Sequence, residues 1–284
     1  MRSVGDTVTG VRVALDPAMP VLLRPDGAVQ IGWDPSRAVV VRPPAGLSAS
    51  SLAVVLRALC APMPVASAVR LACVRGLVDT AAFSSVLDDL LGFGVLRSCE
   101  SASEQTLTVR VHGGGPLAEL LTEGLRCSGA RLSSSHADLV VLADSLAVDP
   151  RLLREMHTAR LPHLPVRVRD GVGVVGPLVI PGVTCCLVCV DLHRTDHDPA
   201  WPALAAQLRD VIGCADRPTV LATAALALGQ VQRVIAGVRA GDGGAGCPPP
   251  SSFNTSWELD VTTTTLSARR WPRHPLCGCW PSHG

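Results

Sequence analysis

TLTVRVHGGGPLAELLTEGLRC, residues 106–127, is the stretch of sequence that decides the fold of this chain. The apolar run in 106–111 predicts a β-strand, and the three glycines and the proline of 112–116 predict a tight turn. Residues 117–127 repeat apolar side chains at helical spacing. The stretch is therefore a strand, a glycine turn and a helix, which is how a Rossmann-like sheet begins.

The same alternation continues downstream. Short apolar runs predict strands at 130–133 and 138–143, and a helix follows at 150–161. Strands at 166–169 and 172–180 continue the sheet as an antiparallel pair that turns at Asp170-Gly171. Strands that alternate with helices through short loops are typical of a parallel sheet, so the fold class is α/β.

Farther along, one apolar stripe predicts a long helix that packs on this sheet: Val220, Ala224, Leu228, Val231, Ile235 and Val238. Residues 241–252 contain four glycines and three consecutive prolines, which predicts a mobile loop. The Thr-rich residues 256–267 predict one more strand.

The first hundred residues have a different rhythm. Short apolar runs at 20–24, 28–32 and 37–42 are bounded by Pro, Asp and Gly, which is typical of a strand meander. Helical spacing then begins at Leu52 and predicts a first helix. Two more helices are predicted at 64–75 and 80–91, and a short wing strand at 92–97. This order predicts a small α+β winged-helix-like domain over residues 1–100, followed by the α/β domain over residues 106–284.

Composition excludes several classes of function. All 25 basic residues are Arg, and 24 acidic residues leave a formal net charge of +1. A phosphate-binding or Schiff-base lysine is therefore excluded, and the near-neutral charge argues against nucleic-acid binding. The longest apolar run, 219–229, is shorter than the roughly 18 residues of a membrane span. Residues 1–6 lack an apolar signal region, so a cytoplasmic protein with reduced cysteines is expected.

Four of the eleven cysteines form two closely spaced pairs, Cys186-Leu-Val-Cys189 and Cys277-Gly-Cys279. Two such pairs suit a tetrahedral four-thiolate zinc site, in which each pair occupies one edge. A closed site of this kind is structural. Cys185 is an alternative ligand to Cys186, and the competing interpretation is that these are ordinary buried cysteines.

The glycine turn Gly113, Gly114 and Gly115 opens a helix, where backbone amides can bind a phosphate of ATP. Asp144 ends a predicted parallel strand, at the edge where α/β sheets bind ligands, and is the best-placed lone carboxylate of this domain. Pro116 removes one amide donor, and Ser133 begins a serine run where a ribose-binding acid is expected. A purely structural turn is therefore an equal alternative.

A dense polar run at 191–198 follows the first cysteine pair, and Trp201 lies just beyond it. A cluster of His and Asp beside Cys invites a catalytic interpretation. The simpler interpretation is a solvated helix or loop, with Trp201 as an anchor in the core or at an interface.

Residues 176–189, 191–202 and 274–279 together resemble the ThiF/MoeB/MccB superfamily of ubiquitin-activating-like adenylating proteins. More narrowly, they resemble its branch in the biosynthesis of thiazole/oxazole-modified peptides, which includes cyclodehydratase and leader-peptide-binding proteins. The resemblance spans residues 106–280. It implies structural zinc on the four paired cysteines and a homodimer formed through the α/β domain.

Active members of this superfamily carry an intact glycine loop, an acidic residue after the second strand, an Asn/Arg segment, a Lys and a metal-binding Asp. Only Asp144 matches here. The resemblance therefore implies a non-catalytic or degenerate protein that presents a precursor peptide to a partner enzyme of the YcaO type. The alternative is an adenylyltransferase that uses ATP and Mg²⁺ to activate the C-terminus of a peptide or of a ubiquitin-like sulfur-carrier protein.

The first hundred residues resemble the PqqD-like recognition element of ribosomally synthesised and post-translationally modified peptides (RiPPs). That element is a winged-helix fold that binds a leader peptide as an added strand. The resemblance places the peptide along 37–42, beside the helix at 80–91. The residues expected to contact it are Val39, Val40, Val41, Phe83 and Leu87.

Overall fold

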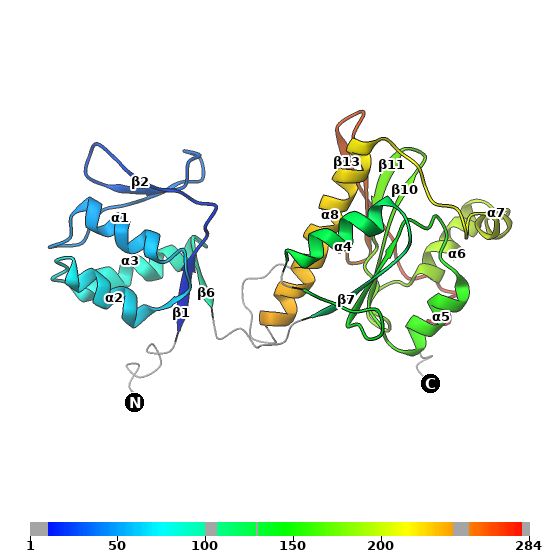
Figure 1. Ribbon diagram of the computed structural model, residues 1–284, viewed down its shortest axis with the longest axis horizontal. Helices are drawn as coiled ribbons and strands as arrows, with labels where there is room; N and C mark the ends of the chain where they lie inside the picture. Colours follow the sequence, from blue (N-terminus) through cyan, green and yellow to red (C-terminus); the bar gives the residue numbers. More distant parts are fainter. Residues whose placement is uncertain (1–10, 100–106, 129, 241–249, 280–284) are drawn as a thin grey trace. The chain divides into compact units, whose positions relative to one another are not determined.

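The computed structural model describes residues 11–99, 107–128, 130–240 and 250–279. The chain divides into two compact units, Met1–Ala102 and Ser103–Gly284 (Figure 1). Each unit has a hydrophobic core of its own, so each can be understood from its own residues.

The first unit contains three helices and two small sheets. Its elements in chain order are β1 (Arg12–Leu15), β2 (Val21–Leu23), β3 (Val29–Ile31), β4 (Val39–Val41), α1 (Ala49–Ala58), β5 (Met63–Pro64), α2 (Val65–Val74), α3 (Thr80–Gly92) and β6 (Leu96–Cys99). One antiparallel sheet has the order β2-β3-β4, and the other has the order β5-β1-β6. Among the residues that the structure describes, β4 is therefore an edge strand.

The predicted meander and helices of this unit are confirmed. Short strands form where the apolar runs lie, and α3 begins where the Asp79 side chain accepts a hydrogen bond from the Ala82 N–H at 3.0 Å. Strand β1 was not predicted. Its Val13 and Leu15 are buried, but four residues are too few to show a period, and the strand is stabilised by pairing with the distant β6.

The second unit is one sheet covered by helices. Its elements are β7 (Thr108–His112), α4 (Pro116–Arg126), β8 (Arg131–Leu132), β9 (Leu139–Ala143), α5 (Pro150–Thr158), β10 (His163–Arg169), β11 (Val172–Val175), α6 (Leu187–His197), α7 (Trp201–Gln207), α8 (Arg217–Ala240), β12 (Thr255–Asp260) and β13 (Thr265–Arg270). The seven strands have the order β13-β12-β11-β10-β9-β7-β8.

The sheet is mixed. Strands β7 to β10 are parallel, and β11 to β13 continue the sheet antiparallel. The predicted antiparallel pair is confirmed as β10 and β11, and its turn is made by Asp170 and Gly171, which both have positive φ. The α/β class predicted from the alternation of strands and helices is therefore confirmed.

Helices cover both faces of this sheet (Figure 1). Strand residues such as Val141 and Val166 pack with α4 and α8 on one face. Val140 and Leu142 point to the opposite face, where they pack with α5 and α6. Alternate residues of a strand face opposite sides, so the long apolar run of β9 is fully buried.

Helix α8 packs on the sheet as predicted, but it is longer than the apolar run suggested. Residues Arg217–Val238 are long and apolar enough to cross a membrane by length and composition alone, which corrects the expectation that no segment is. The helix is nevertheless a core helix, because one stripe of it is buried against the sheet and α4: Val220, Ala224, Ala227, Val231 and Ile235.

The segment at 256–267 was predicted as a single strand, but it contributes to a hairpin of two strands, β12 and β13. The turn forms because the Asp260 carboxylate accepts the N–H groups of Thr262 and Thr263, and Thr264 takes a positive φ. Most of the loop predicted at 241–252 lies outside the described residues.

Candidate functional site

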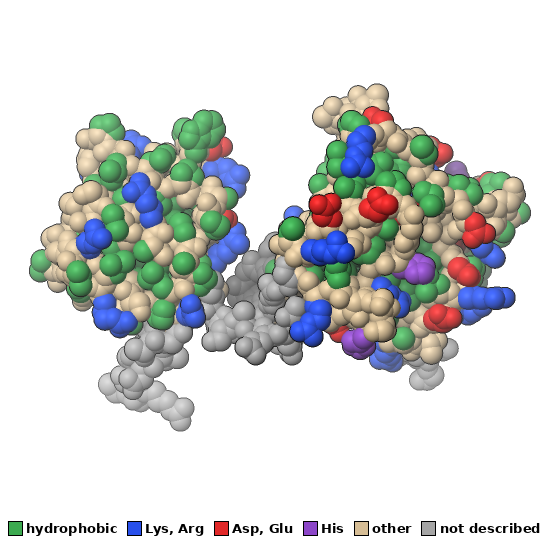
Figure 2. Space-filling model, viewed as in Figure 1, with side chains coloured by type: hydrophobic (Ala, Val, Ile, Leu, Met, Phe, Trp, Pro, Cys, Tyr) green, Lys and Arg blue, Asp and Glu red, His purple; other side chains and the backbone are tan. Residues whose placement is uncertain are grey.

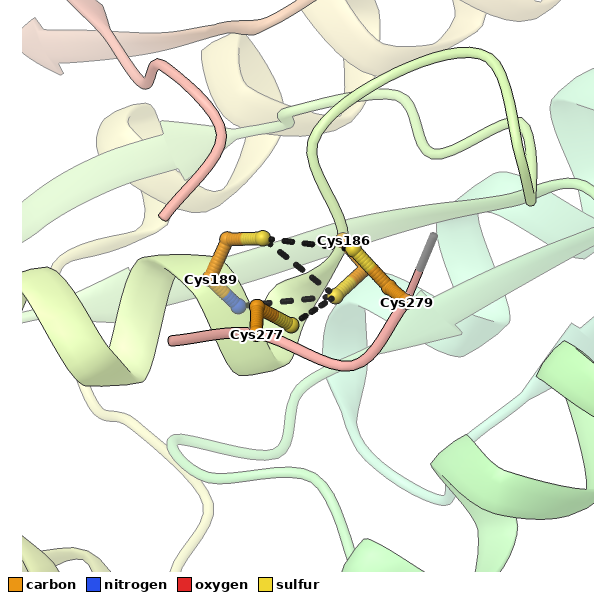
Figure 3. A group of neighbouring side chains, drawn as sticks. All are labelled: Cys186, Cys189, Cys277 and Cys279. Carbon is orange, nitrogen blue, oxygen red and sulfur yellow. Dashed lines mark hydrogen bonds between the residues drawn. The ribbon is translucent and has the colours of Figure 1, made fainter. Parts of the chain in front are cut away.

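Four sulfur atoms from two distant segments meet beside the start of α6 (Figure 3). Cys186 is the N-cap of α6 and Cys189 lies in its first turn. The Sγ atom of Cys186 lies 3.7 Å from that of Cys189 and 3.5 Å from that of Cys277. The Sγ atom of Cys189 lies 3.5 Å from that of Cys279.

This geometry fits zinc. A tetrahedral site with Zn–S bonds of 2.3 Å has sulfur atoms about 3.8 Å apart, close to the separations seen here. The pKa of Cys189 is lowered to about 4, mainly because the thiol of Cys186 donates a hydrogen bond to its sulfur. Burial helps to raise the pKa of Cys279 to about 12. Zinc binding would have to displace the protons that these sulfurs share.

Cys185 is not part of the cluster. Its side chain is fully buried, and burial raises the pKa of its thiol to about 12. Its backbone N–H donates to the Asn254 side chain at 2.7 Å, which turns the chain into α6. Between the two alternatives that the sequence left open, the structure therefore gathers Cys186 with the other three thiols.

Sequence reasoning missed a contact that supports this cluster. His274 donates from Nε2 to the Asp196 carboxylate at 2.8 Å, and its Nδ1 accepts the Leu276 N–H at 3.1 Å. The carbonyl of His274 also accepts the Cys277 N–H at 3.0 Å. A signal was present, since Asp196 lies two helical turns beyond Cys189 and thus on the same face of α6.

Two further residues of the polar run, Asp191 and Arg194, contact Trp201, whereas His197 and Asp198 are exposed. The Asp191 carboxylate accepts the Trp201 indole N–H at 3.1 Å and pairs with Arg194 at 3.3 Å. The Arg194 guanidinium lies 4.7 Å from the centre of the Trp201 ring. Trp201 therefore anchors α7 to α6, which is the structural role that the sequence allowed for it.

The glycine turn and Asp144 come together at the N-terminus of α4. The Asp144 carboxylate is almost fully buried and accepts three backbone N–H groups, those of Gly115, Leu117 and Ala118, each at 3.0 Å. The positive end of the helix dipole favours a negative charge at this place. The N–H groups of Gly115, Leu117 and Ala118 are thus engaged by a carboxylate of the chain itself.

Close contact explains two of the three glycines. A Cβ atom on Gly113 would lie 2.4 Å from the carbonyl oxygen of Ala143, and one on Gly115 would lie 2.6 Å from the Asp144 side chain. Gly114 has no atom within 4 Å of that position. The turn is therefore tight because it packs against the end of β9.

In the first unit, β4 and α3 form the walls of a groove, here named the β4–α3 groove, of about 170 Å³. Its residues are Val39, Val40, Val41, Arg42, Val86, Asp89, Leu90 and Phe93. The three valines predicted to contact a peptide line it. Figure 2 shows apolar side chains among basic ones on the visible face of this unit.

Phe83 and Leu87 do not line the groove, which corrects the sequence-based expectation. Both are buried in the core of the first unit, with at most 1% of each residue exposed. They point inward because they lie one turn apart on the face of α3 that packs on the core. On this side the groove is lined instead by Val86, Leu90 and Phe93, of which Leu90 is itself buried and Phe93 is exposed.

No protein-family model and no curated protein matches the sequence. Among solved structures, the chain is similar to a heterocyclase in complex with substrate and cofactor, with a TM-score of 0.68 at 14% identity. It is also similar to the heterocyclase TruD, with a TM-score of 0.68 at 18% identity. These matches cover 95% of this chain but only 40% and 43% of the heterocyclase chains.

Escherichia coli MccB with ATP is a further similar structure. It matches with a TM-score of 0.58 at 13% identity, over 95% of this chain and 100% of the MccB chain. A structure of E. coli MccB with MccA also matches, with a TM-score of 0.59 at 12% identity. The resemblance to the ThiF/MoeB/MccB superfamily is thereby confirmed for the fold: this chain has the α/β fold shared by TruD and MccB.

Proposed function

We propose that this chain is a non-catalytic ThiF-like protein that binds a precursor peptide and presents it to a partner enzyme in RiPP-type modification. The observation that carries this proposal is the free edge of β4 beside the apolar side of α3. A strand added at such an edge gains main-chain hydrogen bonds, and the neighbouring apolar wall adds specificity. The three helices and small sheets of this unit support its likeness to a winged-helix recognition element.

The hydrogen bonds between Asp144 and the glycine turn support the proposal that the protein is non-catalytic. A nucleotide phosphate at α4 would have to displace the Asp144 carboxylate from three N–H groups. The chain also has no Lys to neutralise a triphosphate, and Ser133 stands where a ribose-binding acid is expected. Nucleotidyl transfer depends on charge stabilisation at these positions.

The heterocyclases to which this chain is similar support a role in peptide modification. The chain spans less than half of each heterocyclase chain. We propose that a partner enzyme of the YcaO type performs the modification. A peptide held in the first unit would be delivered to that protein.

Zinc would have a structural role in this scheme. Cys186, Cys189, Cys277 and Cys279 would hold it, and the bound ion would supply a cross-link between the start of α6 and the segment after β13. Such a cross-link stabilises the folded chain because the site does not exist in the unfolded one.

A direct test combines two measurements on the full chain. Labelled peptides encoded beside its gene, rich in Cys or Ser, are titrated against the protein, and binding is followed by fluorescence anisotropy. Calorimetry with Mg-ATP and an ATP/pyrophosphate exchange assay run in parallel. Peptide binding without exchange is the expected result, and the absence of binding by every such peptide would refute the proposed function.

The alternative, an adenylyltransferase that activates the C-terminus of a peptide or sulfur-carrier protein, is favoured by one observation. The match with MccB in its ATP complex covers the whole MccB chain. Saturable Mg-ATP binding with pyrophosphate exchange would establish this alternative. It would also require Asp144 to leave the N-terminus of α4.

A further inference from the structure

The hydrogen bonds of the β2–β3 hairpin fix which backbone groups of β3 face β4. The Arg24 N–H donates to the Ala28 carbonyl at 3.0 Å, and the Gly32 N–H donates to the Pro20 carbonyl at 2.9 Å. In an antiparallel pair, the hydrogen-bonded positions recur at every second residue. Gln30 lies midway between Ala28 and Gly32, so its N–H and C=O also point toward β2.

The backbone groups of Val29 and Ile31 therefore point toward β4, where these residues pair with Val41 and Val39. Val40 lies between the two pairs, so its N–H and C=O point away from β3 and toward the open edge. Because β4 is the last strand of its sheet, an added strand can pair with these groups. Its side chains would alternate between the α3 side and the outer face.

On the α3 side, the added strand would meet an apolar wall. Val86 and Leu90 lie one turn apart on α3, and Phe93 is the C-cap of that helix; Leu90 is buried, so Val86 and Phe93 offer the accessible apolar surface. Phe93, one of three phenylalanines in the chain, is 69% exposed, which is unusual for a large apolar side chain. Exposed aromatic side chains of this kind are typical anchors at interfaces.

Two charged side chains of opposite sign also line the β4–α3 groove. Arg42 follows β4 directly, and Asp89 lies one turn before Phe93. Within the described part of the chain, neither forms an ion pair. The pKa of the Asp26 carboxyl is lowered mainly by the hydrogen bond from the Ala28 N–H, and the charge of Arg42 contributes least to this lowering. The groove thus offers one free cation and one free anion beside its apolar wall.

We propose, as a refinement that rests on the proposed peptide-binding function, that the β4–α3 groove selects its peptide by charge as well as by apolar side chains. The occupant is an extended segment with two apolar residues at alternate positions. An acidic side chain of the segment faces Arg42, and a basic one faces Asp89.

The test is a selection of random dodecapeptides, displayed on phage, on the immobilised full chain. The expected consensus has two apolar residues separated by one position, with an acidic and a basic residue flanking them. The selection is repeated on Arg42→Glu and on Asp89→Arg. Each reversal is expected to invert the preferred charge at one flanking position only, and to weaken a wild-type consensus peptide by about 2- to 5-fold, the scale of an exposed ion pair.

Val40→Pro serves as the variant that tests strand addition. It removes only the N–H that points away from β3, so the sheet itself keeps its hydrogen bonds. Binding of the consensus peptide is expected to fall by at least about 10-fold, the scale of a lost hydrogen bond. The matched control, Val40→Thr, keeps this N–H and is expected to bind normally. A circular dichroism spectrum and melting curve confirm that both variants fold.

The outcomes separate this refinement from the proposed function. A consensus with apolar residues but no flanking charges, or one unchanged by both reversals, would overturn the charge selection and leave peptide binding intact. No enriched peptide at all would overturn peptide binding itself. A homodimer that Val40→Pro dissociates would show that the edge pairs with a second copy of the chain and would overturn the refinement.

Discussion

The Nε2 atom of His274 lies 2.8 Å from Oδ2 of Asp196 and donates a hydrogen bond to it, which links the second cysteine pair to helix α6. The His274 side chain is only 4% exposed. Because its Nδ1 accepts the Leu276 N–H, its proton is held on Nε2. The segment that carries Cys277 is therefore oriented by the hydrogen bonds of a buried imidazole to the exposed Asp196 carboxylate and to the Leu276 N–H.

His274→Ala is expected to lower zinc affinity by about 10- to 100-fold, the usual cost of losing a group that orients metal ligands. A competition titration with a chromogenic chelator measures the affinity. His112→Ala, an exposed position on β7, is the control and should bind zinc normally. Equal affinities in the two variants would show that the contact does not support the site.

Cys189→Ser is expected to reduce zinc from about one ion per chain to nearly none, because a four-thiolate site loses one of its ligands. Elemental analysis of protein purified without chelator gives the ratio. Cys185→Ser changes the neighbouring buried thiol that lies outside the cluster and should retain zinc. Zinc retained in Cys189→Ser would contradict the assignment of the ligands.

The packing of the glycine turn can be tested by replacing single glycines with alanine. Gly113→Ala is expected to destabilise the chain by about 1–3 kcal/mol, because its Cβ would clash with the Ala143 carbonyl and its φ of 151° disfavours a side chain. Gly114→Ala has open space and should change stability by less than about 0.5 kcal/mol. Urea unfolding measures both. Equal losses would mean that packing against β9 does not determine this turn.

Asp144→Asn should destabilise the second unit by about 2–4 kcal/mol, because three buried N–H groups lose a charged acceptor. Asp149→Asn is a matched control at the N-terminus of α5, where a partly solvated carboxylate accepts a single N–H. A cost below about 1 kcal/mol is expected there. Similar unfolding curves for the two variants would refute the structural role of Asp144.

Because the imidazole of His163 is buried, we expect the folded chain to lose stability in acid. Burial lowers the pKa of this imidazole from its ordinary 6.5 to about 4. Between pH 6.5 and 4, the unfolded chain binds more protons than the folded one, so stability falls by up to roughly 3 kcal/mol as the pH drops. Above pH 6.5 the contribution is fully present.

His163→Gln removes this titration and keeps a donor for the Leu161 carbonyl. The free energy of unfolding in urea, compared at pH 7.0 and pH 4.5, should therefore change less in the variant than in the natural chain. His112→Gln, at an exposed position on β7, is the control for replacing a histidine by glutamine. An identical pH dependence in His163→Gln would show that the imidazole does not titrate abnormally.

Local signals in the sequence determined much of the architecture. Apolar periodicity predicted the meander, the parallel strands and every described helix except α6 and α7, because burial on one face imposes a repeat that neighbouring residues reveal. Cysteine spacing predicted the cluster of four thiols, since Cys186 and Cys189 lie one turn apart at the start of α6 and point the same way. The antiparallel turn at Asp170 was equally local.

Only the tertiary structure decided which residues meet across long separations. β1 exists because β6 pairs with it, and His274 reaches Asp196 across 78 residues of chain. Asp144 lies at the end of β9, as the sequence predicted, yet its role depends on the N-terminus of α4, which begins near Gly115. Such contacts leave no repeat in the sequence, because they are set by how sheets and helices pack rather than by neighbouring residues.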